Sequence, residues 1–223
     1  MQISEVRLLM ICIFIVLLVL FGNAFAEPIH EAVLDNNVKK VKRLIKEGAD
    51  VNVKDSMGIT AIHEAAIGGN KQIIEILISN GADVNVESKN GYTPLHFAVQ
   101  YDLVEVAELL IEKGADVNKN SATEDKWSPL NVAAYNGHRD IVKLLIQKGA
   151  NVNYADTHRW SSLHTAVLKG HIEVVELLII QGADINAEGE DHGWFRGGTP
   201  LNIAIHNGYE DIAELLHQHG GYE

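Results

Sequence analysis

A six-residue phrase that recurs along the chain constrains its fold more than any other feature. The phrase GADVNV occupies residues 48–53, and close variants return at residues 81–86, 114–119, 149–154 and 182–187. The starts of these copies are 33, 33, 35 and 33 residues apart. A fixed period in this range is typical of stacked supersecondary units, each too small to bury its own apolar residues. We therefore expect a solenoid rather than a single closed core.

A second phrase recurs in phase with the first. It reads TAIH at residues 60–63, TPLH at 93–96, SPLN at 128–131, SSLH at 161–164 and TPLN at 199–202. The initial Thr or Ser can cap a helix, and a following proline fits the first helical position. Apolar residues at helical spacing follow, and a second helix then ends at the glycine of the GADVN phrase. Asn36 and Asp102 replace the usual glycine between the two helices, and both residue types tolerate the left-handed conformation expected there.

Together the two phrases resemble the ankyrin repeat over residues 27–223. The resemblance implies an all-α fold, an ankyrin-repeat solenoid of six helix–turn–helix units joined by hairpin-like loops. We place the units at about residues 27–54, 55–87, 88–120, 121–155, 156–188 and 189–223, in one domain. Lys40, Arg43 and His217 stand where internal repeats carry apolar residues. Because terminal repeats need polar outer faces, we expect an array that is complete at both ends.

Residues 1–26 have the pattern of a secretory signal peptide. Residues 8–21 are an unbroken apolar run, followed by the small-residue pattern AFA at 24–26. The run is shorter than the roughly 20 apolar residues of a membrane span. An uncleaved membrane anchor is the alternative, because the segment before the run carries only Arg7 and is offset by Glu5. Both interpretations predict export from the cytoplasm, to the periplasm or the medium.

Composition narrows the class of partner. The only cysteine, Cys12, lies in the leader, so the rest of the chain can form neither a disulfide nor a cysteine metal site. The formal net charge is -12, which makes nucleic acid and anionic lipid poor partners and favours a protein with a basic surface. We expect a monomer with no membrane span after cleavage.

No catalytic or cofactor site can be assembled from the sequence. Six of the eleven histidines occupy positions that the ankyrin resemblance makes structural. The three near the C-terminus, His206, His217 and His219, are a weak alternative metal or small-ligand site, with no acidic partner to orient them. Acidic residues in the long loop at 188–198 lack the alternating spacing of a calcium-binding loop. We therefore expect neither an enzyme nor a bound cofactor.

Aromatic residues at matching places in successive repeats give the functional signal. The residue before each TPLH-like phrase is Ile59, Tyr92, Trp127 or Trp160, and the resemblance puts this position on the concave side of the loops. A parallel row lies at the end of each first helix, and the longer sixth loop adds further side chains. The remaining candidates are Tyr101, Tyr135, Leu168, Lys169, Trp194, Phe195 and Arg196. Because Trp, Tyr and Arg dominate interface hot spots, these residues predict a protein-binding groove.

The resulting interpretation is a non-enzymatic protein-binding scaffold acting outside the cytoplasm. Its size and leader resemble those of exported bacterial ankyrin proteins. An immunity protein or a secreted effector using the same groove is the alternative within this class.

Overall fold

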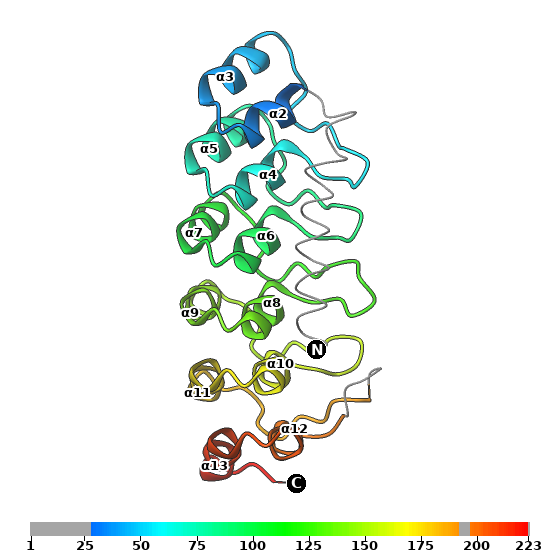
Figure 1. Ribbon diagram of the computed structural model, residues 1–223, viewed down its shortest axis with the longest axis vertical. Coiled ribbons are helices and arrows are strands. Elements are labelled where there is room, and N and C mark those ends of the chain that lie inside the picture. Colours follow the sequence, from blue (N-terminus) through cyan, green and yellow to red (C-terminus); the bar gives the residue numbers. More distant parts are fainter. Residues whose placement is uncertain (1–27, 192–196, 223) are drawn as a thin grey trace. The chain divides into compact units, whose positions relative to one another are not determined.

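The computed structural model describes residues 28–191 and 197–222. These residues contain twelve helices and no strand, with two isolated bridges between Ala155 and Ser161 and between Gly189 and Gly198. Their contacts divide them into two compact units, which meet between residues 83 and 84. Figure 1 shows that each unit repeats one motif, a pair of short antiparallel helices followed by a protruding loop, which we call a finger. The predicted all-α repeat solenoid is confirmed.

The first unit contains two helix pairs. They are α2 (Pro28–Leu34) with α3 (Val38–Lys46), and α4 (Ala61–Ile67) with α5 (Lys71–Ser79). Helix α2 packs against α4, and α3 packs against α5. Ile29, Val41, Ile62, Ile73 and Leu77 are fully buried between them. The apolar positions that the helical spacing indicates therefore form the contact between the pairs.

The second unit contains four helix pairs. They are α6 (Pro94–Gln100) with α7 (Val104–Glu112), α8 (Pro129–Asn136) with α9 (Arg139–Gln147), α10 (Ser162–Lys169) with α11 (Ile172–Ile180), and α12 (Pro200–Asn207) with α13 (Glu210–Gln218). The first helices α6, α8, α10 and α12 stack on one another, and the second helices form a parallel layer on the side away from the fingers (Figure 1). Leu95, Leu110, Leu145, Leu163 and Leu178 are fully buried. The core of this unit is thus a row of nearest-neighbour interfaces.

The Thr or Ser of the TPLH-like phrase caps each of the helices α4, α6, α8, α10 and α12. At α6, the His96 Nδ1 lies 3.2 Å from the Thr93 backbone nitrogen and 2.9 Å from its hydroxyl. At α8 an asparagine takes the place of the histidine, and Asn131 Oδ1 accepts a hydrogen bond from the Ser128 backbone N–H at 3.2 Å. These reciprocal bonds satisfy backbone donors that a helix start otherwise leaves unpaired.

The asparagine of the GADVN phrase joins each repeat to the next. In the second unit the Asn118 side-chain NH₂ donates to the Gly149 carbonyl at 3.1 Å, and its Oδ1 accepts from the Asn151 N–H at 2.8 Å. The same pair of bonds recurs at Asn85, Asn153 and Asn186, and at Asn52 in the first unit. The recurrence of this residue therefore has a structural cause, since each copy satisfies backbone groups of its neighbour.

The turns between paired helices confirm the left-handed positions that the sequence indicates. Asn36 has φ 52° and Asp102 has φ 56°, and Gly137, at the equivalent turn of another repeat, has φ 77°. Gly137 is also required by close packing, because a Cβ there would lie 2.7 Å from the His171 ring.

Candidate protein-binding site

The fingers hold the residue that precedes each TPLH-like phrase in a fixed position. In the fifth repeat, Asp156 Oδ1 accepts from the backbone N–H groups of His158 and Trp160, at 2.9 and 2.8 Å. The backbone N–H of Asp156 donates to the Trp160 carbonyl at 3.0 Å and closes the turn. In the first unit Asp55 makes the same bonds around Ile59. The finger thus sets the direction of this side chain before any partner binds.

Trp127, Tyr135 and Lys169 form a cluster that spans two repeats, which we call the aromatic cluster. The Trp127 and Tyr135 ring centroids are 4.9 Å apart, and the Lys169 ammonium lies 4.5 Å from the Tyr135 centroid. All three side chains are half-buried. The indole packs on the phenol and the phenol on the cation, so this cluster presents a contiguous surface of the kind that anchors protein partners.

Backbone contacts behind the aromatic cluster hold it in place. The His171 Nε2–H donates to the Tyr135 carbonyl at 3.0 Å, at the end of α8. Burial lowers the pKa of His171, as do the nearby Lys169 and His138, and the Tyr135 carbonyl only partly opposes them. The ring is therefore held in the neutral form that can keep this bond near neutral pH.

Three other candidates lie in the same unit as the aromatic cluster. Tyr92 is half-buried and packs against Phe97 and His96, with ring centroids 5.7 and 5.1 Å away. Burial, reinforced by Asp125, raises the pKa of its phenol. Tyr101 and Leu168 are also half-buried. The sequence did not single out Phe97, although its place one position after the phrase histidine was visible.

Ile59 and Trp160 differ from the expected ladder of accessible side chains, because both are buried, at 8% and 5% exposure. The Trp160 indole N–H donates to the Glu190 carbonyl at 2.8 Å, and its ring lies 5.7 Å from that of His164. The longer sixth loop supplies this carbonyl and covers the indole. Trp160 thus links the fingers of two neighbouring repeats and is not exposed to a partner.

The remaining candidates, Trp194, Phe195 and Arg196, lie outside the described residues.

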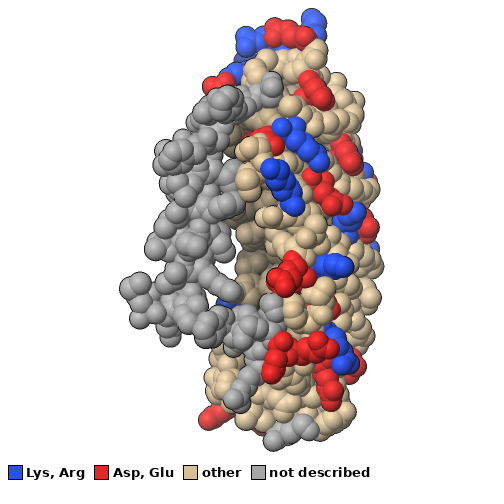
Figure 2. Space-filling model, turned by 90° about the vertical axis from the view of Figure 1, so that its right-hand side faces the viewer, with Lys and Arg blue, Asp and Glu red and all other residues tan. Residues whose placement is uncertain are grey.

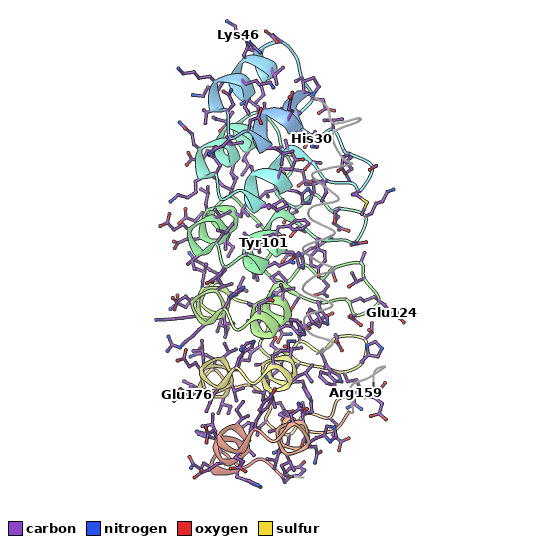
Figure 3. All side chains as sticks on the ribbon, in the orientation of Figure 1. His30, Lys46, Tyr101, Glu124, Arg159 and Glu176 are labelled. Atoms are coloured by element: carbon purple, nitrogen blue, oxygen red, sulfur yellow. The ribbon has the colours of Figure 1, made fainter. Side chains whose placement is uncertain are left out.

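Neighbouring fingers of the second unit are joined by side-chain bonds. The Tyr154 hydroxyl donates to the Lys126 carbonyl at 2.7 Å, and the Thr157 hydroxyl donates to the Glu124 carbonyl at 2.8 Å. Figure 3 shows Glu124 and Arg159 on these fingers, on the opposite side of the unit from Glu176 of α11. A surface braced in this way loses less conformational entropy when a partner binds.

The histidines of the TPLH-like phrase are occupied by structural bonds. In α10 the His164 Nδ1 lies 2.8 Å from the Ser161 hydroxyl, and its Nε2 faces the Ala187 and Gly198 carbonyls at 3.1 and 3.3 Å. Burial lowers the pKa of His164 to about 4, and the carbonyls oppose this only in part. Among the described residues, no group of three or more histidine, aspartate or glutamate side chains could hold a metal ion.

Comparison with protein families agrees with this architecture. A model described as ankyrin repeats (3 copies) matches residues 29–121 and 119–189, and one described as ankyrin repeats (many copies) matches residues 163–217. The chain belongs to the ankyrin repeat family. Ankyrin repeats generally mediate protein–protein interaction and are typically non-enzymatic. No curated protein matches this ankyrin chain. In the part of the chain that the structure describes, no helix is long and apolar enough to cross a bilayer.

Proposed function

We propose that this ankyrin protein is a non-enzymatic scaffold that holds another protein on the face carrying the aromatic cluster. One observation carries the proposal, which is that Trp127, Tyr135 and Lys169 pack together across two repeats while remaining half-buried. Such side chains lose little rotamer entropy on binding and offer a large contact area with polar ends. Tyr92, Tyr101 and Leu168 extend the surface over the same row of first helices.

Charge around the cluster favours a partner with a basic surface. Glu124, Asp125, Asp156 and Glu190 outnumber Lys126 and Arg159 on the fingers that flank Trp127 and Trp160. Together with the net charge of -12, these carboxylates would raise the association rate of a basic protein. The leader-like pattern of residues 1–26 supports an encounter outside the cytoplasm. A helper of an exported enzyme, an immunity protein and a secreted effector would all use this same surface.

A crosslinking experiment tests the role of the aromatic cluster. The tagged full chain is expressed in its native host, crosslinked, and its partners are compared with those of Trp127→Ala/Tyr135→Ala. The matched control is Ile180→Ala/Tyr222→Ala, which truncates two side chains that are 67% and 60% exposed in repeats five and six. We expect one or more partners to be lost from the cluster variant and retained by the control. Equal recovery of every partner by both variants, with unchanged circular dichroism, would refute the proposal.

A further inference from the structure

The second helix of the first repeat carries a stripe of cations on its solvent face. Lys39, Lys42, Arg43 and Lys46 follow the spacing i, i+3, i+4, i+7, so all four lie on one side of α3. All four side chains are exposed, whereas Val41 on the opposite side is fully buried. We call these four residues the cationic stripe. Figure 3 shows Lys46 at the end of α3, and Figure 2 shows that charges of both signs occur on the face in view.

Capping of the array does not explain the cationic stripe. A terminal repeat needs a polar residue only where internal repeats bury an apolar one, and Arg43 meets that need. Lys39, Lys42 and Lys46 occupy positions that face solvent in every second helix, and in the second unit those positions are mainly acidic. The acidic counterparts are Glu105, Glu108, Glu112, Asp140, Glu173, Glu176, Asp211 and Glu214. Solubility alone requires polar side chains and not a single sign of charge.

Most of the stripe is not neutralised locally. Arg43 has a long, exposed contact with Glu47, with 3.8 Å between Nε and Oε1. Glu31 forms an ion pair with Lys40, which is outside the stripe, with 2.8 Å between Nζ and Oε2. Among the described residues, Lys39, Lys42 and Lys46 form no ion pair. Three cations therefore remain available to an external anion.

A groove between α3 and α5 adjoins the stripe. Its volume is about 510 Å³, and Lys42, Lys46, Ser79 and Asn80 line it together with Ile45, Ile76 and Glu75. The two lysines are exposed, whereas Ile45 and Ile76 are half-buried. The groove thus offers two ammonium groups and a hydroxyl against one carboxylate, Glu75, beside the two isoleucines, so its lining carries a net positive charge that suits a headgroup phosphate.

We propose that the cationic stripe and this groove bind the surface of an anionic phospholipid membrane. Three lysines and one arginine, with no aromatic side chain lining the groove, differ from a protein interface, where lysine is depleted and aromatic residues are enriched. An anionic bilayer attracts clustered lysines and arginines. The net charge of -12 is an average over the whole chain, whereas helix α3 itself carries five basic residues and no acidic one.

Vesicle co-sedimentation tests this proposal on the protein purified after expression of the full chain. One set of vesicles contains phosphatidylcholine alone, and the other contains equal parts of phosphatidylcholine and phosphatidylglycerol. We expect binding to the anionic vesicles at low salt to exceed binding to neutral vesicles by at least tenfold, and to weaken as salt screens the charges. Any contribution of residues 8–21 would act on both sets of vesicles and cancels in this ratio.

Two quadruple variants with equal charge changes isolate the stripe. The first is Lys39→Gln/Lys42→Gln/Arg43→Gln/Lys46→Gln, and the control is Lys89→Gln/Lys113→Gln/Lys143→Gln/Lys148→Gln, which neutralises exposed lysines of the second unit. The stripe variant is expected to lose the preference for anionic vesicles, and the control to keep it. The proposal fails if both variants lose the preference equally. It also fails if the wild type binds soluble polyglutamate but no anionic vesicle, which would assign the stripe to an acidic protein.

Discussion

A buried ion pair in the first unit should make its stability fall as pH rises. Glu64 occupies a helix position that is Phe97, Val132 or Ile203 in three of the four repeats of the second unit. Its Oε1 lies 3.1 Å from the His30 Nδ1, and the two side chains are only 12% and 2% exposed. The second carboxylate oxygen of Glu64 is buried with no hydrogen-bond partner among the described residues.

The pKa shifts of both groups have the same sign. Burial lowers the pKa of His30, but the adjacent Glu64 carboxylate, with the Val53 carbonyl and Asp55, outweighs it and raises the pKa above 6.5. Burial raises the pKa of Glu64 above 4.5, and His30 opposes this only in part. The folded unit therefore binds protons more tightly than the unfolded chain. The contribution of His30 is complete below pH 6.5 and is lost as pH rises through its folded-state pKa, and the loss from Glu64 begins above pH 4.5.

The loss of stability expected on removing one partner follows from the burial of the His30–Glu64 pair. Removing one partner of a buried ion pair typically costs about 3–5 kcal/mol, and we expect His30→Ala to lie near 3 kcal/mol because Glu64 retains some solvent contact. Glu64→Leu should cost far less, since it restores the apolar residue that equivalent helices carry and leaves His30 its bond to Val53 at 3.1 Å. Each tenfold change in proton affinity corresponds to about 1.4 kcal/mol.

Hydrogen exchange is the appropriate assay. All three tryptophans lie in residues 84–223, so their fluorescence reports on the second unit alone. Amide protection in α2 and α3, corrected for the intrinsic exchange rate at each pH, should fall between pH 6 and pH 8 in the wild type and stay level in Glu64→Leu. If α2 is better protected at pH 8 than at pH 6, or if Glu64→Leu retains the full pH dependence, the reasoning is wrong.

Three further predictions concern the second unit, with urea unfolding followed by tryptophan fluorescence. Lys126→Gly and Arg159→Gly should each stabilise it by about 0.5–1 kcal/mol, because φ 51° and 63° strain these side chains; no gain at either site would contradict this. His164→Asn places at this position the residue that α8 carries as Asn131, and it should remove about 3 kcal/mol of destabilisation between pH 6.5 and 4. The destabilisation arises because the unfolded chain takes up a proton in this range, whereas the folded ring, with its pKa of about 4, does not. An unchanged dependence of stability on pH would count against this prediction. Leu145→Ala should cost about 2–5 kcal/mol, since the side chain is fully buried, and a loss below 1 kcal/mol would show that the stack closes around the cavity.

The features that could be predicted from the sequence are those set by local chemistry and repeated in every unit. Thr93 is followed by a proline and a histidine at fixed spacing, and the helix start follows from these residues alone. The left-handed turns at Asn36 and Asp102 could be expected because only a few residue types tolerate that conformation. Each repeat is a further test of the same local inference, and the fold could therefore be predicted from the sequence.

The candidate site was less predictable because it depends on contacts between repeats. Trp127 and Trp160 occupy the same place in the repeat, yet the first remains half-buried and the second is covered. The difference comes from the Glu190 carbonyl, which belongs to a loop 30 residues further along whose length departs from the period. A periodic pattern contains no information about what an irregular loop covers.

The histidine of the TPLH-like phrase shows the same limit in its chemistry. His30 and His164 occupy the same place in their repeats, and both are buried. The pKa of His30 is raised because a carboxylate replaces the usual apolar neighbour, whereas burial lowers the pKa of His164 and the carbonyls and Asp184 oppose it only in part. Acid should therefore strengthen the first unit as pH falls towards 6.5 and weaken the second as pH falls from 6.5 to 4. The repeat fixes where the imidazole lies, and one residue in the next repeat decides which way its protonation changes the stability.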